Sequence, residues 1–111
     1  MSELCNLNCT PCRGGEPPIG EEELLRFLTQ IPDWELITDG KLRKLTRQFR
    51  FKNFRQALEF GNRVGELAEE HRHHPLLCIE WGRVTVTWWT HAIEDLHLND
   101  CVMAAKTDLL Q

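Results

Sequence analysis

The chain has 111 residues, of which 41% are hydrophobic and 27% are charged, and its formal net charge at pH 7 is −4. These values predict one soluble domain that is large enough to fold without a disulfide or a metal. The 13 Lys and Arg residues are spread along the chain and the apolar runs are short, so we expect neither nucleic-acid binding nor a membrane span. Because Met1 is followed by polar residues and cysteines rather than by an apolar secretory segment, we expect a cytoplasmic protein.

The first 20 residues differ in character from the rest of the chain. They are rich in turn-forming residues and show no hydrophobic period. This composition predicts an irregular, cysteine-bearing arm over residues 1–20, followed by a folded domain over residues 21–111.

The five cysteines fall into two groups. Cys5, Cys9 and Cys12 have a spacing that radical enzymes use to bind an iron–sulfur cluster, and three thiolates can also bind zinc. Such radical enzymes need a large barrel, for which this chain has no room, so a disordered thiol-bearing arm is the simpler interpretation and a metal site the alternative. Cys78 and Cys101 lie in apolar patterns, and we expect them to be core thiols of a reduced compartment.

The first folded segment reads as a helix followed by a hairpin. Apolar residues recur at helical spacing over residues 21–31 and stop at a proline. Two strands, over residues 34–38 and 41–51, then flank Asp39-Gly40, which can supply the positive φ angles of a two-residue turn. Leu42 breaks the alternation of the second strand, which predicts a bulge or a register change next to it.

A second helix is predicted to begin after Asn53, whose side chain can cap it. Its apolar residues recur at steps of three and four. Because residues before a proline are pushed out of the α region, we expect this helix to stop at about His73 or His74.

The remaining chain predicts a second hairpin and a last helix. Strands over residues 76–81 and 84–90 alternate clearly around Gly82-Arg83, and a helix is expected over residues 99–110. The order α-β-β-α-β-β-α predicts an α+β fold, in which helices pack on one face of a four-stranded antiparallel sheet.

Histidines concentrate where the second helix is predicted to end. His73 and His74 stand together before the proline, and His91 closes the last strand. Glu69 precedes His73 by four residues, so a helix would place its carboxylate beside that imidazole. Imidazoles that lie near neutral pH in their titration suit a site that both gives and takes protons. His71 and a further histidine, at position 97, look like solvated or capping residues.

Two other interpretations of the histidines remain open. They could be surface residues at a helix end, or three imidazoles and a carboxylate could bind zinc. The zinc interpretation is weaker because adjacent side chains such as His73 and His74 usually point apart. Trp89 shares its strand face with His91 and could flank a flat heterocycle.

A larger set of residues carries a resemblance to a known family. The set comprises Glu69, His73-His74-Pro75, Trp81, His91 and Asp100, at these intervals, with Ile31-Pro32-Asp33-Trp34 upstream. It resembles the signature of the pterin-4a-carbinolamine dehydratases, also known as the dimerisation cofactor of a hepatocyte homeodomain factor. The resemblance extends from about Glu21 to the C-terminus.

The resemblance implies a lyase that dehydrates 4a-hydroxytetrahydropterin to quinonoid dihydropterin and so recycles the cofactor of aromatic amino-acid hydroxylases. It implies no metal and no organic cofactor. His73 and His91 would be the acid/base pair and His74 an orienting and electrostatic partner. Glu69 and Asp100 would shape the site by contacting these histidines rather than the substrate. By adjacency alone, four further residues should line the substrate pocket: Arg72, Trp89, Thr90 and Ala92.

The resemblance also implies a homodimer or homotetramer. The chain departs from related sequences in having Ile93-Glu94-Asp95-Leu96 where they tend to have glycine or another small residue, and in having His97 where a capping Ser or Thr is expected. A partner-binding module, or an accessory protein that binds a pterin or molybdopterin without dehydrating it, are the alternatives to the enzyme.

Overall fold

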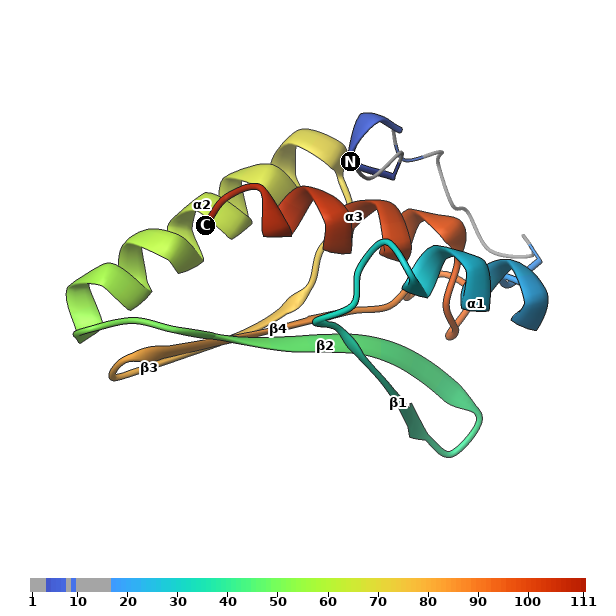
Figure 1. Ribbon diagram of the computed structural model, residues 1–111, viewed down its shortest axis with the longest axis horizontal. Coiled ribbons are helices and arrows are strands. Elements are labelled where there is room, and N and C mark those ends of the chain that lie inside the picture. The colour runs from blue at the N-terminus through green and yellow to red at the C-terminus, as the bar shows by residue number, and fades with distance from the viewer. Residues whose placement is uncertain (1–3, 8, 10–16) are drawn as a thin grey trace.

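Helices cover one face of an antiparallel sheet and leave the other face open (Figure 1). The computed structural model describes residues 4–7, 9 and 17–111, and within these residues it contains one short 3-10 turn, three α-helices and four strands. In chain order they are η1 (Leu4–Asn6), α1 (Glu21–Leu28), β1 (Glu35–Asp39), β2 (Leu42–Arg50), α2 (Phe54–His71), β3 (Leu76–Glu80), β4 (Arg83–Trp88) and α3 (Leu98–Asp108). The sheet order is β1-β2-β4-β3, with all pairs antiparallel. The predicted fold class and element order are confirmed.

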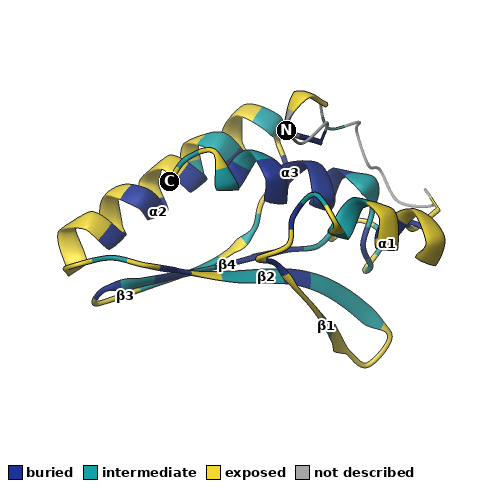
Figure 2. Cartoon of the chain, in the orientation of Figure 1, coloured by how far each residue is buried: buried dark blue, intermediate teal, exposed yellow. Residues whose placement is uncertain are grey.

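The core lies between the sheet and the helices, as the burial colours in Figure 2 show. Alternate residues of the two central strands, including Phe49, Val84 and Trp88, point toward the helices and are almost fully buried. The apolar stripe of α2, with Phe60 and Val64, packs against them. The helix α3 is buried along most of its length because it also packs against α1 and η1.

The first hairpin differs from its prediction in one respect. Asp39 pairs with Leu42, so the two turn residues are Gly40 and Lys41 rather than Asp39 and Gly40. Gly40 has φ 66°, the positive angle that glycine adopts without strain. The register runs without interruption from Asp39↔Leu42 to Glu35↔Thr46, so the predicted bulge is wrong: Leu42 simply lies on the open face of the sheet.

The helix α2 begins as predicted and ends earlier than predicted. The Asn53 side chain accepts a hydrogen bond from the Gln56 backbone N–H at 2.9 Å, which confirms the cap. The helix ends at His71, because Arg72 adopts a left-handed conformation with φ 53° and its N–H closes the last turn. This reversal turns the next residue, His73, into the interior.

The helix α3 begins with a capping box. The His97 ring accepts a hydrogen bond from the Asn99 N–H at 3.1 Å, and the Asp100 carboxylate accepts one from the His97 N–H at 2.9 Å. His97 therefore replaces the expected Ser or Thr, and its capping role is confirmed.

The thiols separate by environment. Cys101 on α3 is buried, as predicted, whereas Cys78 is exposed because it lies on the open face of β3, so the prediction of a core thiol is wrong there. The metal site considered for the arm cannot be compared, because Cys12 and the Cys5 side chain lie outside the described residues. None of the described helices has the length and apolar character required to cross a bilayer.

Candidate active site

A buried hydrogen-bond network joins three of the residues singled out in the sequence. His73 is only 9% exposed, and its Nε2 lies 2.6 Å from Asp100 Oδ1. The Thr90 hydroxyl donates to Asp100 Oδ2 at 2.7 Å. His73 follows the end of α2, Thr90 follows the end of β4 and Asp100 lies in the first turn of α3, so residues far apart in the sequence meet at one point.

The surroundings of Asp100 explain how a carboxylate is stabilised in this interior position. Asp100 is fully buried, but it occupies the first turn of α3, where the helix dipole favours negative charge. It accepts hydrogen bonds from the His73 ring, the Thr90 hydroxyl and the His97 backbone N–H. A carboxylate with three donors is well satisfied without water.

This network orients the His73 ring and, with Asp100 ionised, selects its tautomer. An ionised Asp100 can only accept, so the proton of a neutral His73 lies on Nε2 and Nδ1 becomes the nitrogen that can accept a proton. The His73 ring also stacks on Trp88, with centroids 5.7 Å apart and planes 13° apart. An imidazole held in this way can act as an oriented base, or as an acid once it is protonated.

His74 has a different partner and a different environment. Its Nε2 lies 2.6 Å from Glu69 Oε2, and both side chains are mostly exposed. The sequence had placed Glu69 beside His73, on the assumption that the helix continued. Because the chain reverses at Arg72, Glu69 meets His74 instead, and this expectation is corrected.

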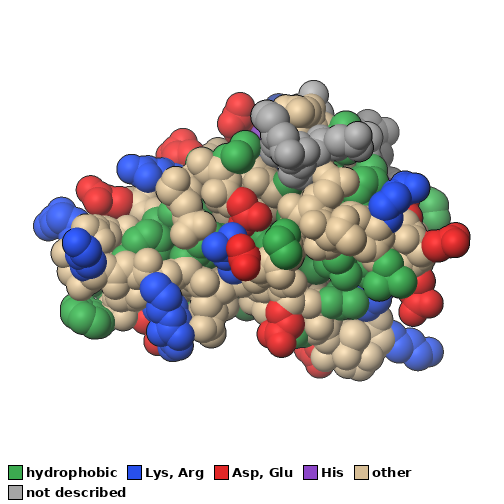
Figure 3. Space-filling model, in the orientation of Figure 1, with side chains coloured by type: hydrophobic (Ala, Val, Ile, Leu, Met, Phe, Trp, Pro, Cys, Tyr) green, Lys and Arg blue, Asp and Glu red, His purple; other side chains and the backbone are tan. Residues whose placement is uncertain are grey.

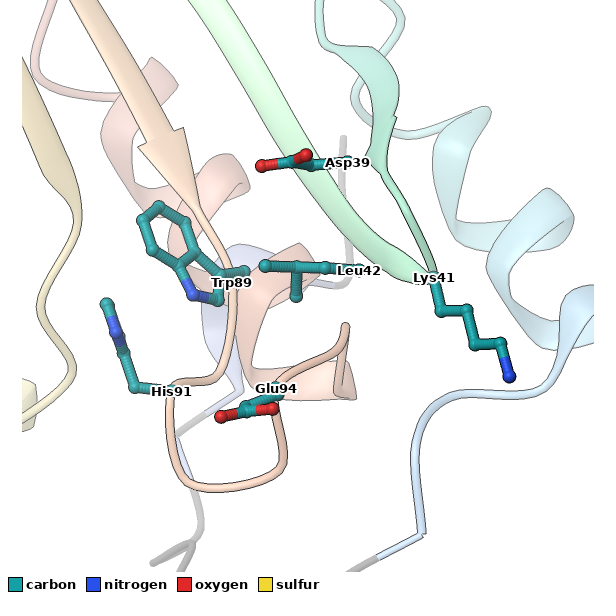
Figure 4. A pocket seen from close by; sticks show the side chains of 6 residues that line it. All are labelled: Asp39, Lys41, Leu42, Trp89, His91 and Glu94. Carbon is teal, nitrogen blue, oxygen red and sulfur yellow. The ribbon is translucent and has the colours of Figure 1, made fainter.

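His91 lines an open pocket at the end of the sheet (Figure 4). Its ring packs against Trp89 with centroids 4.4 Å apart, and Lys44 Nζ lies 4.3 Å from the centroid of the Trp89 indole. The pocket has a volume of about 500 Å³, and its lining residues come from the first hairpin and from the segment after β4: Asp39, Lys41, Leu42, Trp89, His91 and Glu94. In Figure 4 the Glu94 carboxylate points to the same side as His91, whereas Lys41 points away.

The structure separates the predicted pocket residues. Trp89 lines the pocket, but the Thr90 side chain is buried and binds Asp100 rather than facing the pocket. Arg72 and Ala92 are exposed and do not line it, and neither do His73 and His74. The contribution of the first hairpin was missed, because nothing in residues 39–42 indicates that the turn reaches the end of β4.

The sequence also missed an ion pair behind the pocket. Arg43 Nε donates to Asp95 Oδ1 at 2.9 Å, and Arg43 Nη2 donates to Asp95 Oδ2 at 3.2 Å. Burial raises the pKa of the Asp95 carboxyl, but the hydrogen bonds from Arg43 and from the Leu96 backbone N–H outweigh this effect, so the net pKa is lowered. Only the unusual residues after His91, noted in the sequence, pointed to a special structure here.

Two further properties of the described residues are the distribution of surface charge and the arrangement of side chains that could bind a metal. On the face shown in Figure 3, positive and negative side chains are interspersed rather than gathered by sign. Among the residues that the structure describes, no group of three or more His, Cys, Asp and Glu side chains is arranged to bind a metal ion.

Comparison with known proteins places this arrangement in a family. The sequence profile of the family described as Pterin 4 alpha carbinolamine dehydratase matches residues 17–110. Proteins from Chlorobaculum tepidum and Rubrobacter xylanophilus, both provisionally named pterin-4-alpha-carbinolamine dehydratase, are each 54% identical to this chain over 110 residues. The matched residues cover 99% of this chain in both comparisons, 99% of the Chlorobaculum tepidum protein and 100% of the Rubrobacter xylanophilus protein. The fold is similar to a crystal structure from Brucella melitensis described as a transcriptional coactivator/pterin dehydratase, with a TM-score of 0.76, 31% identity, and 85% of this chain and 98% of that chain covered. The chain belongs to the pterin-4a-carbinolamine dehydratase family.

Proposed function

We propose that this protein removes water from 4a-hydroxytetrahydropterin to give quinonoid dihydropterin, with His73, His74 and His91 as its functional histidines. The observation that carries the proposal is the buried His73–Asp100 pair, in which Nε2 lies 2.6 Å from Oδ1, because donation from Nε2 to an ionised carboxylate leaves Nδ1 as the nitrogen that can accept a proton. Membership of the family supplies the pterin as the substrate class.

The reaction requires two proton transfers on one flat ring. The bond between C4a and the hydroxyl oxygen breaks, and the oxygen takes a proton from an acid and leaves as water. N5 gives up its proton to a base, and the electron pair of the N–H bond forms the new C=N bond of the quinonoid product. His73 and His91 supply the acid and the base between them, since the His73 ring stacks on Trp88, the last residue of β4, and His91 lies three residues after it.

The remaining residues orient either the substrate or a functional histidine. His74, with Glu69 beside it, adds a polar group at the same helix end. Trp89 offers an aromatic surface for a heterocycle next to His91. Asp100 and Thr90 do not touch the substrate but keep His73 in position.

In the cell, this activity would recycle the tetrahydrobiopterin that aromatic amino-acid hydroxylases consume. The proposal includes a cytoplasmic homodimer or homotetramer and a reaction that needs no metal and no organic cofactor.

A partner-binding role is the second candidate. It is favoured by the exposed apolar side chains on and next to the edge strand β3, since Trp81 is 73% exposed and Leu76 is 48% exposed. The Brucella melitensis relative, described in part as a transcriptional coactivator, supports the same reading. In such a module the histidines could be replaced without loss of the biological role.

The test is the rate at which enzymatically generated 4a-hydroxytetrahydrobiopterin loses water in the presence of the intact protein and of histidine variants. We expect His73→Ala and His91→Ala each to slow the reaction by about 10²-fold or more, the usual contribution of one acid/base group. His71→Ala is the matched control, because it removes an imidazole from the same helix end without touching the site. Chelators should leave the rate unchanged. No acceleration by the intact protein would contradict the proposal and favour the partner-binding candidate.

A further inference from the structure

We propose that Arg43 and Asp95 are positioning residues of this site: their ion pair holds the segment 89–96, here called the site loop, in the shape that presents His91. The inference rests on the proposed function, because it assigns these residues a role in the same reaction. Neither residue lines the pocket, so they act through the loop rather than on the substrate.

The Arg43–Asp95 contact has the geometry of a clamp. Two parallel N–H···O bonds join the guanidinium to the carboxylate, at 2.9 and 3.2 Å, and both side chains are about four-fifths buried, with 19% and 21% exposed. Such a bidentate pair fixes direction as well as distance. Asp95 Oδ1 also accepts from the backbone N–H groups of Arg43, at 3.3 Å, and Leu96, at 2.8 Å.

A third segment joins the clamp. Arg43 Nη2 donates to the Ile19 carbonyl at 3.0 Å, and the Ile19 N–H donates to the Leu96 carbonyl at 2.9 Å. Ile19 is itself buried. Strand β2, the segment before α1 and the end of the site loop are thus tied together at one point.

The site loop needs this external support because its own conformation is strained. Glu94 has φ 51°, a left-handed angle that is unfavourable for a residue with a Cβ, and the loop contains no glycine to adopt it freely. The Thr90 and Asp95 backbones bond to one another in both directions, at 3.0 and 3.4 Å, and the Glu94 N–H reaches the His91 carbonyl at 3.3 Å. The loop therefore closes on itself immediately around His91.

Both catalytic histidines depend on the same loop. Asp95 pairs with the backbone of Thr90, whose hydroxyl donates to Asp100, and Asp100 orients His73. His91 directly follows Thr90. A loop that loses its clamp would therefore displace one histidine directly and weaken the support of the other.

The experiment compares Arg43→Ala, Asp95→Ala and the double variant with Arg83→Ala. Arg83 makes a matched bidentate pair with Glu80, at 2.8 and 2.7 Å, but it does so at the opposite end of β4. Two quantities are measured on folded protein: kcat and KM for dehydration of 4a-hydroxytetrahydrobiopterin, and the hydrogen-exchange rate of the Thr90 amide, which is bonded to Asp95.

We expect each clamp variant to lower kcat about 10-fold, because a displacement of about 1 Å costs this much or more in an oriented site, while KM changes less than threefold. The double variant should lower kcat by less than the product of the two single effects, because both single variants remove the same ion pair. Thr90 amide exchange should accelerate at least 10-fold. Arg83→Ala should leave both quantities within twofold of the intact protein.

The outcomes separate this inference from the proposed function. Faster Thr90 exchange with unchanged kcat would overturn the positioning role, as would unchanged exchange in the clamp variants. If the intact protein does not accelerate dehydration, the proposed function fails. In that case the imidazole NMR signals of His91 test whether the clamp positions this residue. A shift of these signals in the clamp variants but not in Arg83→Ala supports the positioning role, and unchanged signals in the clamp variants overturn it.

Discussion

Replacement of Asp100 by asparagine should reverse the tautomer of His73 while the fold is retained. The asparagine can direct its oxygen toward the Thr90 hydroxyl and the His97 N–H, which are the two donors that now meet Oδ2. Its amide group then faces His73 Nε2, where Oδ1 lies at 2.6 Å. Because an amide N–H can only donate, Nε2 must accept, and the imidazole proton moves to Nδ1.

The structure sets the size of the two effects. All three hydrogen bonds survive in neutral form, and a neutral bond contributes about 1 kcal/mol less than a charge-assisted one. The relief of burying one charge fewer offsets part of this loss. We therefore expect the free energy of unfolding to fall by about 1–3 kcal/mol, which a domain of this size should tolerate. The dehydration rate should fall by about 10²- to 10⁴-fold, because Nδ1 of His73 would already carry a proton when the ring is needed as a base, and the carboxylate that stabilises the protonated ring would be missing when it is needed as an acid.

Three measurements check this prediction together. Urea unfolding gives the stability, imidazole nitrogen NMR gives the tautomer, and the dehydration assay gives the rate. Asp108→Asn is the matched control: Asp108 lies on the same helix and accepts hydrogen bonds from Trp34 and Arg47, away from the site. It should change the stability and leave the rate within twofold. A reversed tautomer combined with a rate within threefold of the intact protein would refute the role given to His73.

Three further predictions concern stability and reactivity. Because the pKa of Asp95 is lowered in the folded state, its ion pair stabilises the fold above the unfolded pKa of 3.8, and this stabilisation is lost as the pH falls through the folded pKa. Urea unfolding should therefore show a constant difference in stability between the intact protein and Asp95→Asn from pH 5 to 7, and a smaller difference below about pH 4. Burial, with a contribution from a nearby carboxylate, raises the pKa of the Cys101 thiol to about 12. Peptide mapping after alkylation of the folded protein at pH 8 should therefore find the exposed Cys78 modified and Cys101 unmodified, and equal modification would contradict the buried placement of Cys101. Asn53→Ala should cost about 1 kcal/mol of unfolding free energy by removing the α2 cap, whereas Asn62→Ala, on the exposed face of the same helix, should cost nothing; equal effects would refute the capping assignment.

The fold could be predicted well because each element carries its own local signal. The alternation over residues 84–90 predicts which side chains of β4 face the helices, and Asn53 marks the beginning of α2. Boundaries were less predictable. The second helix ends two or three residues early because Arg72 takes a left-handed conformation, and no rule of sequence assigns that conformation to an arginine.

The pairings within the candidate site could not be predicted. The spacing of the histidines singled out His73, His74 and His91 as candidates, but because α2 ends early, Glu69 contacts His74, and His73 contacts Asp100, 27 residues away. The Arg43–Asp95 clamp joins residues 52 positions apart. Contacts over such distances follow from the way strands and helices pack, and a single sequence carries no periodicity that reveals them.

The most direct measurement is the rate constant for dehydration of 4a-hydroxytetrahydrobiopterin as the concentration of the intact protein is raised. We expect a linear increase above the uncatalysed rate, with the same slope for His71→Ala and a slope at least about 10²-fold smaller for His73→Ala. A slope of zero for the intact protein would contradict the dehydratase assignment. Equal slopes for the intact protein and His73→Ala would show that catalysis does not pass through the buried His73–Asp100 pair.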